Sequence, residues 1–225
     1  VKEYMEEKEA VVSILIDTSA SMDYGANKKS DLACLLAAAF AYLGINNMDR
    51  VWLYDMQKMQ SPFSASGGKR ALSQITTWLE QLSFDGIVAI DEVIRQLPAK
   101  GPGITILISD FLQESLLDHT QETLGKLLRF LDYRKQKAIL LQVLAAEELS
   151  VELTGTRNLI DMENQSTLRL TLDTKSIQAY EKALQKFLTQ IGSISAKTGA
   201  FHAVCSTKTD IYQLIFQDLK GLYDI

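Results

Sequence analysis

Residues typical of linkers and disulfide-bonded domains are scarce in this sequence. The 225 residues include 3 prolines, 12 glycines and 2 cysteines, and no stretch is of low complexity. Because no change of composition divides the chain, and an apolar content of 47% is enough for one large core, we expect a single domain over residues 1–225. Cys34 and Cys205 stand in apolar segments, which favours buried, reduced thiols and a reducing compartment over a disulfide.

Long apolar runs and an excess of positive charge are absent as well. The most apolar stretch, 32–43, is shorter than the roughly 20 residues that cross a membrane. A net charge of −5 argues against a general nucleic-acid-binding protein, and we interpret Lys28 and Lys29 as solvated residues at a helix end. The sequence opens on Val1 and shows no signal peptide. We expect it in the cytoplasm, either alone or as part of a longer membrane-anchored protein.

The motifs of several common enzyme classes are missing too. The chain has no Gly-x-Ser-x-Gly, no His-Glu-x-x-His, no Cys-x-x-Cys and no phosphate-binding Gly-x-x-x-x-Gly-Lys loop. Its two histidines, His119 and His202, have no serine, cysteine or carboxylate partner recognisable in the sequence, so we interpret both as structural. These absences favour a protein that is not an enzyme.

Apolar runs bounded by turn residues alternate with segments of helical period along the chain. This alternation predicts an α/β fold with a single doubly wound, mostly parallel sheet and helices on both faces. Ser176 is the expected N-cap of one helix, and the segment 151–172, which breaks the alternation, is expected to add a hairpin or an edge strand. The expected strands are 11–16, 51–54, 59–63, 104–109, 138–144 and 203–205, and the expected helices are 31–43, 69–82, 88–97, 116–131, 176–196 and 211–219.

The string Asp17-x-Ser19-x-Ser21 directly follows the apolar run 11–16. A carboxylate and two hydroxyls on a tight loop after a buried strand supply hard oxygen ligands of the kind that small divalent cations prefer. The alternative is that Asp17 and Ser19 cap the loop and the next helix by accepting backbone hydrogen bonds. The pattern therefore predicts a candidate cation site, with loop capping as the structural alternative.

This string and its setting resemble the metal-ion-dependent adhesion site of von Willebrand factor A domains, which have a Rossmann-like fold. The likeness continues at Ile106-Leu107-Ile108-Ser109-Asp110-Phe111, where the family places an aspartate that completes the site. Further matches extend over nearly the whole chain and resemble a bacterial branch often encoded beside MoxR-type AAA+ ATPases. The resemblance implies metal ligands at Asp17, Ser19, Ser21 and Asp110 and an AAA+ ATPase as partner.

Sheet winding, combined with the strand order of A domains, supplies a further argument for this site. Ligands of open parallel sheets bind beyond the carboxyl ends of strands where the winding reverses, and the A-domain order brings Asp17 and Asp110 to one solvent-facing rim there. Two facing carboxylates repel each other unless a cation lies between them.

One position departs from the family pattern. Members usually place a threonine ligand after a glycine in the loop before a later helix, and here Gly86 is followed by Ile87. Because an apolar side chain cannot coordinate a cation, we expect Mg²⁺, or Mn²⁺ or Ca²⁺, to bind weakly. Asp85 or Ser83 could substitute through a water molecule.

The expected function is protein–protein interaction, in which a divalent cation with an open coordination position accepts a carboxylate from a partner, with a role in complex assembly or maturation. A scaffold domain of the same fold that binds its partner without metal is the first alternative. A metal-dependent phosphohydrolase is the second, since aspartates at strand ends also serve such enzymes. The sequence offers that enzyme no evident nucleophile.

Overall fold

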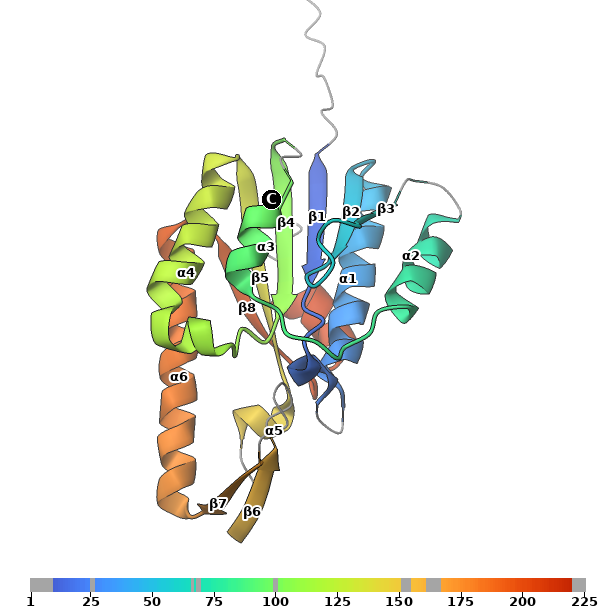
Figure 1. The fold of residues 1–225 in the computed structure, drawn as a ribbon. Coiled ribbons are helices and arrows are strands. Elements are labelled where there is room, and N and C mark those ends of the chain that lie inside the picture. The colour runs from blue at the N-terminus through green and yellow to red at the C-terminus, as the bar shows by residue number, and fades with distance from the viewer. Residues whose placement is uncertain are drawn as a thin grey trace, which may run out of the picture.

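The central sheet has six strands in the order β3-β2-β1-β4-β5-β8 (Figure 1). The structure is a computed structural model and describes residues 10–24, 27–65, 67, 70–98, 101–150, 155–160 and 167–219. All neighbouring strands are parallel except β3, which pairs antiparallel with β2 at one edge. The expected doubly wound sheet is therefore confirmed. The strands are β1 (Val11–Ile16), β2 (Arg50–Asp55), β3 (Phe63–Ala65), β4 (Gly103–Ser109), β5 (Gln136–Leu144) and β8 (Phe201–Ser206).

Helices cover both faces of this sheet and enclose two separate apolar cores (Figure 1). The face with α1 and α2 buries residues such as Leu36 and Ile75. The face with α3, α4 and α6 buries residues such as Leu127 and Ile191. β1 is buried along its whole length, and β4 and β5 along most of theirs, which explains the continuous apolar sequences of these central strands. The helices are η1 (Ala20–Asp23), α1 (Lys29–Asn46), α2 (Ala71–Glu80), α3 (Ile90–Gln96), α4 (Glu114–Tyr133), α5 (Ala146–Leu149), α6 (Thr174–Lys197), α7 (Ile211–Gln213) and the π-helical turn η2 (Leu214–Asp218).

The pairing of β1 with β4 sets the position of the candidate site. Ile16 is level with Ile108, and the Asp17 backbone N–H donates to the Ile108 carbonyl at 2.9 Å. Both strands run in the same direction, so the residues after them leave the sheet at the same edge. The expected adjacency of these two strand ends is confirmed.

Two local expectations were wrong. The short strand expected at 59–63 lies at Phe63–Ala65, because the residues after β2 form turns in which Lys58 donates to Asp55 and Ser61 donates to Lys58. The N-cap of α6 is Asp173 and not Ser176, because the Asp173 carboxylate accepts the Ser176 backbone N–H at 2.7 Å.

The first turns of α6 extend past the sheet, beside a small hairpin (Figure 1). The apolar stripe expected to face the core is buried at Leu184, Phe187 and Ile191, but Tyr180 is exposed. In the segment expected to hold a hairpin or an edge strand, β6 (Gly155–Ile160) and β7 (Thr167–Leu172) pair antiparallel as a separate two-stranded sheet. Residues 151–154 and 161–166 of that segment lie outside the described residues.

Cys34 and Cys205 do not form a disulfide. Cys205 is fully buried in β8, and Cys34 is partly buried in α1. Burial and the nearby charge of Asp31 raise the pKa of Cys34 to about 11, so its thiolate is scarce at neutral pH. Within the described part of the chain, no helix combines the length and apolar character needed to cross a membrane.

Candidate functional site

Asp17 is held by one hydrogen bond from its own loop and one from the end of β4. Its carboxylate accepts the Ser19 backbone N–H at 2.9 Å and the Ser109 hydroxyl at 2.5 Å. Asp17 is fully buried, and Asp110 is 1% exposed, so neither aspartate lies on a solvent-facing rim as the sequence suggested. The bond to Ser19 is the loop-capping contact that the sequence left open as an alternative.

Three of the four predicted ligands form a continuous chain of oxygen atoms. The hydroxyls of Ser19 and Ser21 are 3.1 Å apart, and the Ser21 hydroxyl donates to Asp110 Oδ2 at 2.9 Å. The other oxygen of Asp110 accepts the Leu112 backbone N–H at 3.0 Å. The fold therefore brings Ser19, Ser21 and Asp110 together, and Asp17 joins them through the backbone of Ser19.

Lys29, the first residue of α1, lies inside this cluster and not in solvent. Its side chain is 1% exposed, and its ammonium lies 2.7 Å from Asp110 Oδ2 and 2.7 Å from Glu148 Oε1. Burial alone would lower the pKa of Lys29, but the two carboxylates outweigh it and the pKa is raised. The interpretation of Lys29 as a solvated residue at a helix end was therefore wrong: it is a buried cation.

Glu148 is the second partner of this lysine and was not among the predicted site residues. It lies in α5, after the end of β5, with 15% of its side chain exposed. Its other carboxylate oxygen accepts the Ala145 backbone N–H at 2.8 Å, and Tyr180 of α6 donates its hydroxyl to the Glu148 carbonyl at 3.1 Å. These contacts fix Glu148 beside Lys29. No local motif around Glu148 marks it as a site residue.

The charges of the cluster are unevenly balanced. Asp110 is paired with Lys29, whereas Asp17 accepts hydrogen bonds from neutral groups. Burial first, and then the negative charge of Asp110, raise the pKa of Asp17 to about 6, against the effect of its hydrogen bonds to Ser109 and Ser19. The negative charge of Asp110 therefore disfavours the charged form of Asp17.

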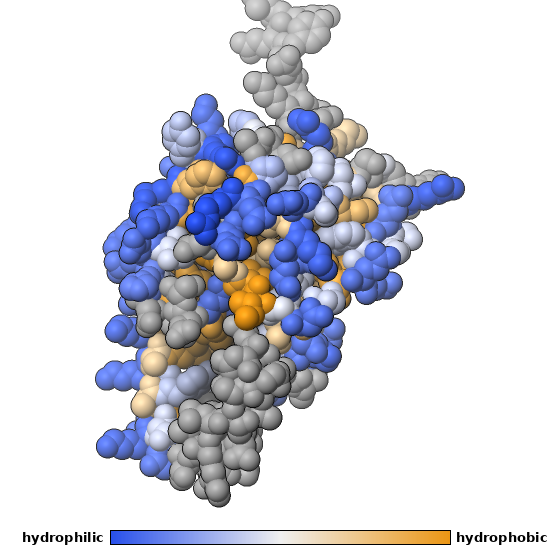
Figure 2. All heavy atoms as spheres, in the orientation of Figure 1, coloured by the Kyte–Doolittle hydropathy of each residue, from blue (hydrophilic) through white to orange (hydrophobic). Residues whose placement is uncertain are grey.

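The loop that carries Ile87 lies against the loop after β1. Gly86 forms a bridge with Ser19, and its carbonyl accepts the Ala20 backbone N–H at 2.9 Å. Ile87 follows with 63% of its surface exposed. Ser83 and Asp85, the residues considered as substitutes, are also exposed. Figure 2 shows hydrophobic surface on this face of the molecule near the beginning of α3.

A third aspartate supports the loop from the neighbouring strand. Asp55, at the end of β2, accepts the Thr18 hydroxyl at 2.6 Å and the Gln57 backbone N–H at 2.9 Å. Gln57 in turn donates its side-chain amide to the Thr18 carbonyl at 2.6 Å. Sequence reasoning missed Asp55, although its place after an apolar strand repeats that of Asp17.

A buried amide supports the site from the side of β5 and β8. Gln142, fully buried in β5, donates to the Asp110 carbonyl at 2.9 Å, and its amide oxygen lies 3.0 Å from His202 Nε2. Because the amide oxygen faces the ring, His202 Nε2–H is the donor. His202 thus has a structural role, since it is hydrogen-bonded to the amide that supports Asp110.

His202 should make the protein more sensitive to acid than a variant that lacks this ring. Burial lowers the pKa of this half-buried ring from 6.5 to about 4, so between these values the unfolded chain binds more protons than the folded one. The contribution of His202 to stability is therefore lost as the pH falls from about 6.5 to about 4, by about 1–2 kcal/mol after allowing for solvent screening. The raised pKa of Asp17 acts in the opposite direction over this range, so the difference between wild type and His202→Gln is what reports on His202. Urea unfolding of wild type and His202→Gln over this range measures the difference. A His119→Gln variant is the control, and equal acid sensitivity of wild type and His202→Gln would contradict the assignment.

The four predicted ligands fit a divalent cation in chemistry but not in charge. Hydroxyl and carboxylate oxygens suit magnesium, yet Asp110 already contacts an ammonium and the threonine position is apolar. Among the described residues, no group of three or more His, Cys, Asp or Glu side chains is arranged to hold a metal ion. The magnesium site stays a prediction.

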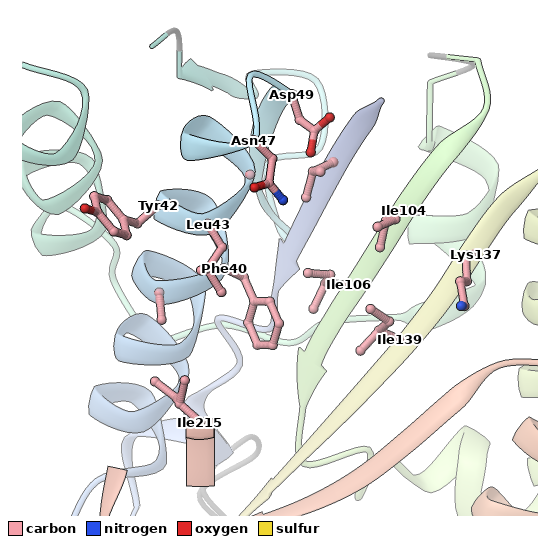
Figure 3. A pocket seen from close by; sticks show the side chains of 13 residues that line it. Phe40, Tyr42, Leu43, Asn47, Asp49, Ile104, Ile106, Lys137, Ile139 and Ile215 are labelled. Atoms are coloured by element: carbon pink, nitrogen blue, oxygen red, sulfur yellow. The ribbon is translucent and has the colours of Figure 1, made fainter. Parts of the chain in front are cut away.

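A separate apolar cavity of about 620 Å³ lies between α1 and the sheet, toward the amino ends of β1 and β4 (Figure 3). Phe40, Ile106 and Ile139 line it, and Asn47 and Asp49 stand at its margin. Asp49 also accepts the Ala10 backbone N–H at 3.0 Å. The cavity contains none of the predicted site residues, so it is not part of the candidate site.

Fold and site together define an open, mostly parallel α/β domain with a polar cluster at the carboxyl edge of its sheet. The chain belongs to the family described as "Protein of unknown function DUF58", which matches residues 1–188. Comparison with curated protein sequences gives no match.

Two solved bacterial structures are similar in fold. One is the conserved hypothetical protein BatB from Bacteroides thetaiotaomicron, with a TM-score of 0.53 and 15% identity over 96% of this chain and 100% of that chain. The other is an aerotolerance-related membrane protein from Bacteroides fragilis carrying multiple mutations to serine, with a TM-score of 0.53 and 13% identity over 96% of this chain and 100% of that chain. At such identities the likeness shows the fold alone.

Proposed function

We propose that this protein is a non-catalytic protein-interaction module that binds its partner at the carboxyl edge of the sheet. The observation that carries the proposal is the convergence of Ser19, Ser21 and Asp110 beside an exposed apolar side chain, Ile87. Exposed apolar side chains next to fixed polar groups are typical of surfaces that bind other proteins. Tyr24, 45% exposed after η1, adds to this apolar character.

The burial of the charged groups supports binding over catalysis. Asp17 and Asp110 are almost fully covered, and each of their carboxylate oxygens accepts a hydrogen bond from within the protein. A nucleophile or a general base has to reach its substrate. The phosphohydrolase alternative is therefore less favoured, and turnover of a phosphoester panel by the purified protein would revive it.

Of the two binding modes raised by the sequence, we favour the one without metal. Lys29 already supplies a positive charge to Asp110, and Ile87 offers an apolar contact in place of a ligand. The metal-assisted mode, in which Mg²⁺ accepts a partner carboxylate, is the second candidate, and the oxygen chain of Ser19, Ser21 and Asp110 supports it. The resemblance to von Willebrand factor A domains supports a MoxR-type AAA+ ATPase as partner, on the cytoplasmic side.

Ile87→Glu should weaken partner binding about tenfold, because it places a charge at the centre of the apolar contact. Tyr133→Glu, at an 87% exposed position at the end of α4, is the matched control and should bind like wild type. Binding to a purified MoxR-type ATPase is measured by interferometry, once in magnesium and once in chelator.

The two binding modes predict different results when binding in magnesium is compared with binding in chelator. Binding that persists in chelator and is lost in Ile87→Glu supports the metal-free mode. Binding that disappears in chelator supports the metal-assisted mode instead. Equal losses of affinity in Ile87→Glu and Tyr133→Glu would contradict the proposed surface. If wild type does not bind the ATPase at all, the proposed partner is wrong.

A further inference from the structure

We infer that the Lys29 ammonium is the resident cation of the carboxyl edge and keeps Asp110 from taking a divalent cation. The inference deepens the proposed function, on which its biological meaning rests, by naming the group that makes partner binding independent of metal. It concerns residues within the protein, so its test requires no partner and can fail separately from the proposed function.

The contacts around Asp110 leave no carboxylate oxygen without a donor. Oδ2 accepts the Lys29 ammonium at 2.7 Å and the Ser21 hydroxyl at 2.9 Å, and Oδ1 accepts the Leu112 backbone N–H at 3.0 Å. The carboxylate of Asp17 is likewise engaged, by the Ser19 backbone N–H and the Ser109 hydroxyl. A divalent cation would have to share or break these contacts.

The ammonium also opposes a second cation by its charge. Magnesium binds oxygen ligands at about 2.0–2.1 Å, so an ion on Asp110 Oδ2 would lie within about 5 Å of Lys29 Nζ. At that distance, in a buried environment, two positive charges repel strongly. The lysine therefore lowers the affinity of the site for any divalent cation, independently of the missing threonine oxygen at Ile87.

Lys29 is held in place and cannot easily move aside. Its side chain is 1% exposed, it starts α1, and its second partner is Glu148 at 2.7 Å. Glu148 is fixed in turn by the Ala145 backbone N–H. A lysine between two anchored carboxylates is a built-in counter-ion, because in the described part of the chain either carboxylate would otherwise lie in the cluster without a positive partner.

Two conservative substitutions distinguish the effect of the lysine on magnesium affinity from the effect of the missing threonine oxygen. Lys29→Gln removes the charge while its amide can still donate to Asp110 and Glu148, so this variant should gain at least tenfold in magnesium affinity over wild type. Ile87→Thr adds the threonine hydroxyl that von Willebrand factor A domains place here but retains the lysine. This variant should bind magnesium no better than wild type. The double variant should bind most tightly.

Calorimetry and thermal unfolding with magnesium, each against a chelator baseline, measure these affinities. A variant at ten times its Kd should unfold about 3 °C higher than in chelator, whereas wild type in about 1 mM magnesium should not shift. Saturable binding by wild type at about 1 mM, a tenfold gain in Ile87→Thr alone, or no gain in Lys29→Gln would each overturn the inference. A Lys29→Gln protein that stays unfolded in about 10 mM magnesium also counts against it, because a cation that can replace the ammonium should restore the fold.

Discussion

Lys29→Ala should lower the free energy of unfolding by about 3–5 kcal/mol at neutral pH without divalent cations. The change removes the ammonium that contacts Asp110 and Glu148, whose side chains are 1% and 15% exposed. Among the described residues, it leaves one buried carboxylate and one mostly buried carboxylate without a positive partner. Urea unfolding followed by circular dichroism measures the loss.

The neighbouring lysine provides a matched control. Lys28 forms an ion pair with Asp23 at 2.7 Å, but both side chains are largely exposed, at 49% and 41%. Lys28→Ala should therefore leave the unfolding free energy nearly unchanged. If the two alanine variants lose similar amounts of stability, Lys29 is not the buried counter-ion that its contacts indicate.

A double-variant cycle isolates the pairing itself. Asp110→Asn removes the charge next to Lys29 but leaves the ammonium its contact with Glu148. In Lys29→Ala/Asp110→Asn the unpaired charge of Asp110 is gone, so the double variant should be less destabilised than the sum of the two single variants. Simple additivity would mean that the two side chains do not act as a pair.

The predicted ligand set could be found from the sequence because it depends on sheet topology. Asp17 and Asp110 each follow an apolar strand, and parallel neighbouring strands deliver both to one edge. Ser19 and Ser21 are fixed to that edge by their closeness to Asp17 in the chain. These positions follow from the order and direction of two strands. Apolar patterning predicts the strands, and the resemblance to von Willebrand factor A domains implies their order.

Lys29 and Glu148 could not be predicted in the same way. The lysine lies 81 residues from Asp110 and 119 residues from Glu148, so its burial depends on where the ends of β4 and β5 meet the start of α1. A lysine at a helix start usually lies in solvent, and local sequence contains nothing to distinguish the buried case. Asp55, unlike Lys29 and Glu148, could have been predicted, because like Asp17 it comes at the end of an apolar strand.

Errors in the elements have similar physical causes. The edge strand β3 has three residues, too few for a period-2 pattern to define its ends. The first turns of α6 extend past the sheet (Figure 1), and Tyr180 of its apolar stripe is exposed. Helical period predicts which face is apolar, but it does not predict how far the sheet extends beneath that face.

Phe111 links the backbone of the site to the core. It follows Asp110 with a φ of 57°, in the left-handed region, while its ring is fully buried. Its backbone N–H donates to the Ser109 hydroxyl at 2.9 Å, and Ser109 also donates to Asp17. A bulky residue in this conformation is strained by about 1–2 kcal/mol, and the buried ring offsets that cost.

Phe111→Ala should therefore lose about 3–5 kcal/mol of unfolding free energy, since it removes the ring and keeps the strain. Phe111→Gly removes the ring but relieves the strain, so it should be about 1 kcal/mol more stable than the alanine variant. Leu107, fully buried in the regular strand β4, is the control position, where glycine should instead be less stable than alanine. Chemical unfolding of the alanine and glycine variants at Phe111 and at Leu107 shows which replacement is the more stable at each position. If alanine is the more stable replacement at both positions, the left-handed turn after Asp110 stores no strain.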